Sequence, residues 1–256
     1  MKIALVVGHS ILKSGACTSA SGFVNEYQYN KKLVPMIAKY VKKVKPSWEV
    51  VTIIVPEKYY SSSKSERTYK FSKINRKKFD RCYEFHLNAA TGKAVGVEQC
   101  YISDAGKKMA NDCLKKLSKV FTNRGVQYRP NLYMLNGTDC PSIICETFFC
   151  DNKEDCERGK DVDKIARLYA EAITGESIPD DTKVSSGGTN PNKKYALVNT
   201  KKNPLKMRAG KSKLTKLIQT VPSKEKVEVL KTCPHWYKCK YNGQVGWITA
   251  EYLKLL

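Results

Sequence analysis

The sequence lacks the features of several protein classes. No apolar run in its 256 residues approaches the ~20 residues of a membrane-spanning helix, so we expect no membrane insertion. No signal peptide is visible, because the apolar run 3–7 ends at Gly8 without a small-residue cleavage site. No helix-turn-helix, RNP-type or finger motif is present, which argues against a specific nucleic-acid partner.

Paired cysteines are also missing. The ten cysteines have no repeated spacing. A structural zinc site needs C-x2-C pairs, and the sequence has none. The run Cys145, Cys150 and Cys156 is a weak metal candidate. We therefore expect reduced, mostly buried thiols that behave as small hydrophobic residues.

Acidic residues are scarce. The 24 Asp and Glu residues face 46 Lys and Arg, so the formal net charge at pH 7 is +22. Residues 1–178 carry 30 basic and 19 acidic residues, whereas residues 179–256 carry 16 and 5. Such a basic surface attracts polyanions by long-range Coulomb forces. Charge alone does not choose among nucleic acid, anionic lipid and an anionic cell-wall polymer.

The first 178 residues alternate strand and helix patterns. Helical spacing of apolar residues predicts helices over Asn25–Val44, with Asn25 as N-cap, over Asp104–Phe121 and over Lys153–Ile173. Apolar runs predict strands at Lys2–Val7, Glu49–Val55, Arg81–Leu87, Gly96–Ile102, Asn131–Leu135 and Ser142–Thr147. This alternation indicates an α/β sandwich around a mainly parallel or mixed central sheet.

The composition changes at Pro179. Residues 179–193 are rich in Pro, Gly, Ser and Asp and read as a linker between a domain at 1–178 and one at 194–256. Short strand patterns follow at Tyr195–Val198, Lys226–Lys231, Trp236–Tyr241 and Val245–Thr249. Asn242-Gly243 between the last two is a strong hairpin signal. The second domain is therefore predicted to be a small β-barrel.

Two of the three histidines lie at predicted strand ends. His9 follows the first strand and His86 closes a later one, and ligands in α/β sheets bind beyond the carboxyl ends of strands. Glu26, at the start of the long helix, offers a carboxylate. Two histidines and one carboxylate form a common catalytic zinc set, which leaves one position to water.

A zinc site of this kind needs a group that moves protons. Glu146 lies at a predicted strand end among strongly apolar residues, where an isolated carboxylate is costly unless it faces a cleft or a partner. Such surroundings raise its pKa toward that of a general base. Each of these residues alone is more often an ordinary structural residue, and the four together favour a site.

These residues carry a resemblance to a known family. The segments Val-Gly-His9-Ser, Val-Asn-Glu26-Tyr, His86-Leu-Asn88 and Ile-Cys-Glu146-Thr-Phe-Phe resemble zinc-dependent N-acetylmuramoyl-L-alanine amidases of the amidase-3 type. The match covers about residues 1–175 and is close to endolysins of phages that infect clostridia. The resemblance implies Zn²⁺ bound by His9, Glu26 and His86, and Glu146 as the catalytic carboxylate. It gives Asn88 a substrate-contacting or ligand-supporting role.

The last part of the chain resembles a bacterial SH3-type domain of cell-wall enzymes. The resemblance rests on Arg208-Ala-Gly210, on Gly246-Trp247-Ile and on the segment from His235 to Gly243. It implies binding to peptidoglycan or to an associated anionic polymer. Trp236, Tyr237 and Tyr252 are the candidate wall-binding residues, whereas Trp247 is expected in the core.

Together the two resemblances imply a peptidoglycan hydrolase, an endolysin or autolysin. It would cleave the amide between N-acetylmuramic acid and L-alanine in a Gram-positive wall, where its C-terminal domain would target it. We expect it to remain in the host bacterial cytoplasm until lysis and then to act at the wall. Two alternatives stay open: a zinc peptidase that cuts within the stem peptide, and a non-catalytic wall-binding protein. The sequence does not indicate the oligomeric state.

Overall fold

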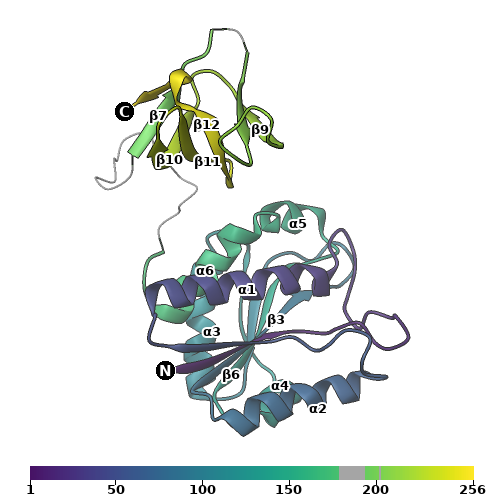
Figure 1. Cartoon of the computed structure of the whole chain (residues 1–256). Helices are drawn as coiled ribbons and strands as arrows, with labels where there is room; N and C mark the ends of the chain where they lie inside the picture. Colours follow the sequence, from purple (N-terminus) through teal and green to yellow (C-terminus); the bar gives the residue numbers. More distant parts are fainter. Residues whose placement is uncertain (179–193, 202) are drawn as a thin grey trace. The chain divides into compact units, whose positions relative to one another are not determined.

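The computed structural model describes residues 1–178, 194–201 and 203–256 (Figure 1). Contacts divide the chain into two compact units, Met1–Thr182 and Lys183–Leu256. The predicted linker, residues 179–193, lies outside the described residues and stays a prediction.

The first unit is built on a six-stranded sheet in the order β2-β1-β3-β6-β4-β5. Its strands are β1 (Lys2–Val7), β2 (Glu49–Ile53), β3 (Arg81–Asn88), β4 (Val97–Tyr101), β5 (Asn123–Tyr128) and β6 (Ser142–Phe149). The pairs β1–β2, β1–β3 and β3–β6 are parallel, and β4 pairs antiparallel with β6. The sheet is therefore mixed, which confirms the predicted α/β class.

Helices cover both faces of this sheet (Figure 1). They are α1 (Glu26–Val44), α2 (Ser63–Ile74), α3 (Asp104–Leu117), α4 (Tyr133–Gly137), α5 (Lys153–Gly159) and α6 (Val162–Thr174), with a 3₁₀ turn at Asn75–Lys77. The larger apolar cluster lies on the face that α1, α3 and α6 cover. A smaller cluster lies on the opposite face, which α2 and α4 cover. Asn25 caps α1 as predicted, because its side chain accepts a hydrogen bond from the Gln28 backbone N–H.

The prediction of a strand at Asn131–Leu135 is wrong. The short helix α4 begins at Tyr133, and it buries Met134 and Leu135. A short apolar run cannot by itself separate a strand from one buried turn of helix. The real strand is β5, a polar segment that the pattern missed. It pairs only with β4 at the edge of the sheet, so it needs few apolar residues.

Two helical expectations also need correction. The predicted helix Lys153–Ile173 is two helices, because α5 ends at Gly159 and Asp161 caps a new start at Val162. Helix α2 was not predicted. Its buried positions are Glu66, Lys70 and Ile74, so two of the three carry charge and hydrophobic periodicity does not reveal the face.

The second unit is a seven-stranded antiparallel sheet in the order β13-β7-β10-β11-β12-β8-β9. Its strands are β7 (Lys194–Val198), β8 (Leu205–Arg208), β9 (Leu217–Val221), β10 (Lys226–Cys233), β11 (Trp236–Tyr241), β12 (Gln244–Thr249) and β13 (Leu253–Leu255), with a 3₁₀ turn at Ala250–Tyr252. Asn242 and Gly243, both with positive φ, join β11 to β12 as the predicted hairpin. The sheet has a small core of its own, built around Val198, Val227 and Ile248.

Two predictions on residue environment can be checked directly. None of the ten cysteines is in a disulfide, and seven are buried, as expected of small hydrophobic residues. No helix within the described ranges is long and apolar enough to cross a membrane.

Candidate active site

The sequence-predicted site residues gather at the carboxyl-terminal ends of the parallel strands β1, β3 and β6. His9 follows β1, Glu26 is the first residue of α1, and His86 lies near the end of β3. Glu146 is in β6, directly opposite His86 in the parallel register. Opposed residues on neighbouring strands point to the same face, so Glu146 lies beside the His86 side chain.

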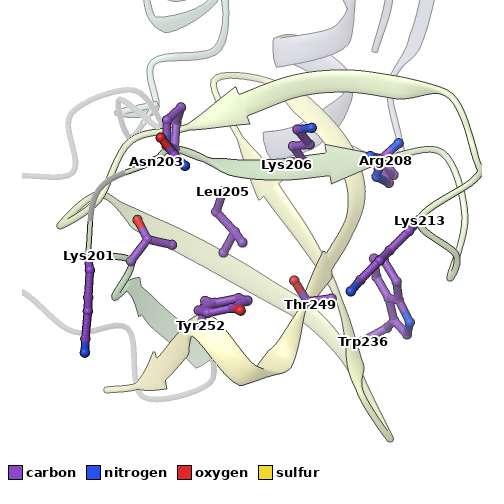
Figure 2. A pocket seen from close by; sticks show the side chains of 11 residues that line it. Lys201, Asn203, Leu205, Lys206, Arg208, Lys213, Trp236, Thr249 and Tyr252 are labelled. Atoms are coloured by element: carbon purple, nitrogen blue, oxygen red, sulfur yellow. The ribbon is translucent and has the colours of Figure 1, made fainter.

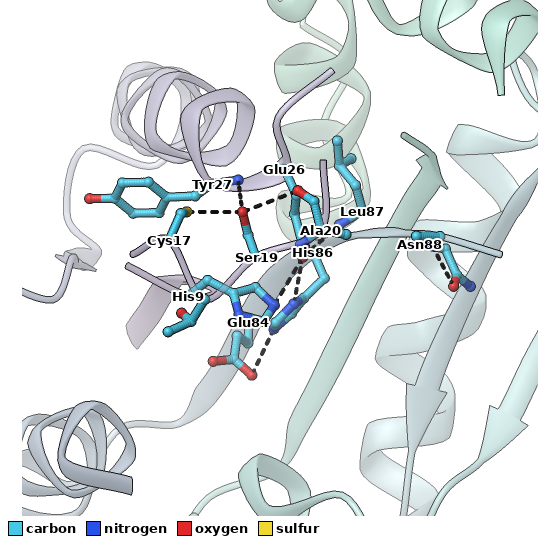
Figure 3. A network of polar contacts seen from close by, with 12 residues as sticks. His9, Cys17, Ser19, Ala20, Glu26, Tyr27, Glu84, His86, Leu87 and Asn88 are labelled. Carbon is cyan, nitrogen blue, oxygen red and sulfur yellow. Dashed lines mark hydrogen bonds and ion pairs between the residues drawn. The ribbon is translucent and has the colours of Figure 1, made fainter. Parts of the chain in front are cut away.

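His9, Glu26 and His86 converge on one point (Figure 3). His86 Nδ1 lies 2.8 Å from Glu26 Oε1, and His9 Nε2 lies 3.3 Å from the same oxygen. The two imidazole rings meet edge to face with centroids 4.8 Å apart. One ligand atom from each of the three residues can be chosen so that all lie within 4.8 Å of one another.

The backbone around β1 makes room for this arrangement. A Cβ on Gly8 would lie 2.4–2.7 Å from the His86 ring atoms, so only glycine fits under the ring. His9 itself adopts a left-handed backbone with φ of 61°, which few non-glycine residues do. The chain is therefore shaped at Gly8-His9 to bring the His9 ring to the His86 ring.

Glu26 is held in place by the backbone of two neighbouring segments. Its Oε2 accepts a hydrogen bond from the Ala20 N–H at 2.9 Å, and its Oε1 accepts one from the Leu87 N–H at 3.1 Å. Burial alone would raise the pKa of this carboxyl, but His86 and His9 hold it well below its ordinary value. Glu26 is therefore an ionised carboxylate, the form that binds a metal.

The second ring nitrogen of His86 faces a carboxylate that is not among the predicted site residues. His86 Nε2 lies 3.2 Å from Glu84 Oε2, and Glu84 Oε1 accepts a hydrogen bond from Lys70 Nζ at 2.6 Å. Burial lowers the pKa of His86, but Glu84 and Glu26 outweigh it and raise the pKa to about 10. The sequence indicates this contact only weakly: Glu84 and His86 are two residues apart in a predicted strand, so they share a face, and Lys70 lies in a segment rich in charge.

Glu146 has the environment of a proton carrier. It is half-buried, and its Oε2 is shielded from solvent and has no hydrogen-bond partner. Burial, with the repulsion of Glu26 and Glu98, outweighs His86 and raises the pKa of this carboxyl to about 7. Near neutral pH both its protonated and its ionised forms are populated, so it can accept and return a proton.

Asn88 lies next to these residues without joining the cluster. Its Nδ2 donates a hydrogen bond to Glu98 Oε1 at 3.1 Å. Glu98 is opposite Glu146 in the β4–β6 register and also forms an ion pair with Arg124 at 3.0 Å. The Asn88 side chain therefore contacts the carboxylate beside Glu146.

The three converging side chains fit a zinc ion. Two imidazoles and a carboxylate are the nitrogen and oxygen donors that catalytic zinc sites use. Two ring nitrogens share one carboxylate oxygen here, which is where a cation would join all three groups. The cysteine run 145, 150 and 156 forms no such cluster in the described part of the chain.

In the second unit, the candidate wall-binding residues separate. Trp236 and Tyr252 line a pocket of about 410 Å³ (Figure 2), whereas Tyr237 packs against the core. Four basic residues, Lys201, Lys206, Arg208 and Lys213, also line the pocket, and no acidic residue is among its lining residues. The expectation that Trp247 fills the core is wrong: its ring is half-buried outside the core cluster, and Lys211 Nζ lies 4.6 Å from its centroid.

Comparisons with known proteins identify both units. The model of the N-acetylmuramoyl-L-alanine amidase family matches residues 3–175, and that of the bacterial SH3 domain matches residues 203–254. The chain belongs to the N-acetylmuramoyl-L-alanine amidase family. A solved structure described as the catalytic domain of the CD27L endolysin targeting Clostridia difficile is 44% identical, with a TM-score of 0.67. That match covers 70% of this chain and 99% of the endolysin domain.

Two further relatives are more distant. The CwlD amidase from Clostridioides difficile, solved in complex with the GerS lipoprotein, shares the amidase fold at 20% identity and a TM-score of 0.59. That match covers 68% of this chain and 96% of CwlD. An uncharacterized 38.4 kDa protein of Clostridium perfringens is 28% identical over 183 residues, which are 68% of this chain. The match spans about half of that curated relative, 51% of its length.

Proposed function

We propose that the first unit is a zinc-dependent hydrolase that cleaves the amide bond between N-acetylmuramic acid and L-alanine in peptidoglycan. Family membership supports the reaction. A metal site is supported by the convergence of His9 Nε2 and His86 Nδ1 on one oxygen of buried Glu26. Glu146, with its pKa raised to about 7, lies one strand away.

Each of the four residues has a distinct role. His9, Glu26 and His86 would hold the ion, with Glu26 fixed by two backbone N–H groups. When bound, zinc supplies Lewis acidity, which acidifies water and polarises the scissile carbonyl. Glu146 takes a proton from the attacking water and later gives it to the amine of the departing L-alanine. The carboxyl ends the cycle in its starting state.

The second unit is proposed to bind the cell wall. The pocket lined by Trp236 and Tyr252 offers aromatic rings for a sugar or peptide, and its four basic residues favour anionic wall polymers. A weak wall binder joined to a hydrolase raises the effective concentration of substrate at the enzyme. Attraction between exposed charges is screened by salt, so binding should weaken as ionic strength rises.

The 44% identity with an endolysin domain also supports a biological setting. We propose that the chain is a phage endolysin that acts at the wall of a Gram-positive, clostridial host. On this proposal it stays in the host cytoplasm until lysis begins.

Product analysis of digested peptidoglycan tests the catalytic proposal. Purified clostridial walls are treated with the full chain, with and without a chelator, and the products are identified by mass spectrometry. The proposal expects free stem peptides with an L-Ala amino terminus, lost with chelator and restored by Zn²⁺. Glu146→Gln should abolish them, whereas Glu157→Gln, at an exposed carboxylate on α5, should not.

Other products would select one of the alternatives. Intact muramoyl-L-Ala links beside cut stem peptides would indicate a zinc peptidase. An absence of any cleavage by the zinc-loaded chain would contradict the hydrolase and leave a wall-binding protein.

Co-sedimentation with insoluble walls tests the targeting proposal. Lys206→Gln with Lys213→Gln removes two charges from the pocket, and the matched control Lys231→Gln with Lys240→Gln removes two exposed charges outside it. We expect weaker sedimentation of the pocket variant at low salt and wild-type behaviour of the control. Equal loss in both variants would show that net charge, rather than this pocket, drives binding.

A further inference from the structure

Helix α2 buries two charges that the proposed reaction does not use. Glu66 and Lys70 lie one turn apart on the face turned to the sheet, and they are 3% and 1% exposed. Charged side chains are almost never buried to this extent unless they are paired. Their partners therefore indicate what this helix does.

Lys70 is linked to His86 through the Glu84 carboxylate. Its ammonium group donates to Glu84 Oε1 at 2.6 Å. Glu84 Oε2 in turn lies 3.2 Å from His86 Nε2, and Figure 3 shows these two side chains facing each other. Glu84 is 0% exposed, so this contact takes place away from water. His86 then has its Nδ1 on the side of Glu26 and its Nε2 on the side of Glu84.

Glu66 is linked to His9 through Ser10, the next residue in the chain. Its Oε1 accepts a hydrogen bond from Ser10 Oγ, and its Oε2 accepts one from Thr18 Oγ1 at 3.2 Å. Ser10 is 1% exposed and directly follows His9, whose backbone is left-handed. Glu66 thus fastens the chain at the point where it takes the rare conformation that aims the His9 ring.

We propose that α2 positions both histidine ligands, His86 through the Lys70–Glu84 pair and His9 through the Glu66–Ser10 hydrogen bond. The inference rests on the proposed zinc site. A histidine ligand commonly donates its other ring N–H to a carboxylate, which fixes the ring and raises its basicity. Glu84 holds the place of that carboxylate at ion-pair distance, with its Oε2 3.2 Å from His86 Nε2, and Lys70 compensates its charge. Lys70 and Glu66 are positioning residues, because they act on the two histidines through Glu84 and Ser10.

A stabilising role alone does not account for the pair. Two buried charges lose their hydration, and well-packed apolar residues of similar size often match or exceed such a pair in stability. An ion pair beside a histidine is better explained by the direction in which it holds the ring. Removal of both charges therefore separates positioning from stability.

The test compares the full-length wild type with Lys70→Met/Glu84→Leu. The control is Lys116→Met/Glu171→Leu, which removes an ion pair between α3 and α6. Three quantities are measured: the Zn²⁺ dissociation constant by chelator competition, the urea midpoint of the metal-free protein, and the absorption spectrum with Co²⁺ in place of zinc. We expect 10–100-fold weaker zinc binding in the α2 double variant and an altered cobalt spectrum. Its urea midpoint should be unchanged or higher, and the control should bind zinc as wild type does.

A conservative variant separates ring orientation from charge. Lys70→Met/Glu84→Gln keeps an oxygen that can accept from His86 Nε2, so it should recover part of the lost affinity. For the His9 side, Ser10→Ala/Glu66→Leu should weaken zinc binding to a smaller degree, because it acts through the neighbouring backbone.

The outcomes distinguish this inference from the proposed function. If wild type binds zinc and Lys70→Met/Glu84→Leu binds it equally well with the same cobalt spectrum, the positioning role is wrong and the zinc site stands. If wild type binds no zinc, the proposed function fails and this inference fails with it. A fall in zinc affinity matched by the α3–α6 control would also overturn it, since any lost ion pair would then have that effect.

Discussion

The two faces of the central sheet differ in what they bury. Along β3, Tyr83 and Phe85 join the large apolar cluster beneath α1, α3 and α6. Glu84 and His86 alternate with them and point to the opposite face, toward α2. The first face stabilises the fold through buried apolar side chains. The second face buries charged side chains, Glu66, Lys70 and Glu84, beside its apolar ones. His86 and Glu146 of the candidate site therefore point to the face that also buries the Lys70–Glu84 ion pair.

Glu146→Gln should produce the largest change in activity. The variant keeps the shape of the side chain but cannot carry a proton, so amide cleavage should fall by about 10²–10⁴-fold. Product release from purified walls measures the loss. A variant that cleaved at the wild-type rate would remove Glu146 from the mechanism.

The same variant should show a pH-dependent gain in stability. Because the folded-state pKa of Glu146 is about 7 against an ordinary 4.5, the folded protein binds this proton more tightly than the unfolded chain. The stability that this proton provides is complete below about pH 4.5 and is lost as pH rises through 7. Urea unfolding with chelator at pH 5 and 8 should therefore show Glu146→Gln gaining on wild type at the higher pH. A constant difference would contradict the raised pKa.

On the apolar face, Phe148→Ala should cost stability without weakening the metal site. Phe148 is fully buried, stacks on Phe121 with centroids 5.3 Å apart and meets Tyr29 edge to face. Its truncation leaves a cavity and should lower the free energy of unfolding by about 3–5 kcal/mol. Urea denaturation gives this value, and zinc titration of the folded protein should match wild type. If Phe148→Ala weakened zinc binding as much as variants on the polar face do, the two faces would not differ in their effect on the metal site.

On the polar face, Lys70→Met alone should also destabilise, but for an electrostatic reason. It leaves Glu84 buried without its cation, which should cost about 3–5 kcal/mol. The further change Glu84→Leu should restore this loss in full in the same urea experiment. Restoration would show that the face tolerates apolar packing and that its charges serve another purpose. Two additive losses would mean that the pair itself stabilises the fold.

Exposed ion pairs should matter least. Arg158 and Glu154 form an i,i+4 pair on α5 at 2.5 Å, and their side chains are 38% and 66% exposed. Arg158→Ala should change the free energy of unfolding by less than about 1 kcal/mol. A larger effect would show that charge pairs stabilise this protein regardless of burial.

Sequence reasoning recovered most of the fold because most elements are apolar. Strand β1 and helix α1 follow clear patterns, since each buries an apolar face. The polar edge strand β5 and helix α2 were missed, because one pairs on a single side and the other buries Glu66 and Lys70. Hydrophobic periodicity cannot detect a face whose buried members are charged.

The candidate site was predicted to a similar extent. Strand ends indicated His9 and His86, and the structure brings them to Glu26 with Glu146 beside them. The contacts of His86 with Glu84, and of Glu84 with Lys70, could not be predicted, because Lys70 lies on α2, a helix that hydrophobic periodicity does not reveal. In the second unit, nothing in the sequence separated Tyr237, which packs on the core, from Trp236, which lines the pocket.

X-ray absorption at the zinc edge tests the central claim most directly. The full chain is loaded with one equivalent of Zn²⁺, and the ligand atoms and distances are read from the spectrum. The account predicts nitrogen and oxygen ligands at about 2.0–2.2 Å, including two imidazoles, and no sulfur at about 2.3 Å. His86→Ala should lose one imidazole contribution. Retention of no zinc, or a shell of cysteine sulfur, would contradict a metal centre at His9, Glu26 and His86.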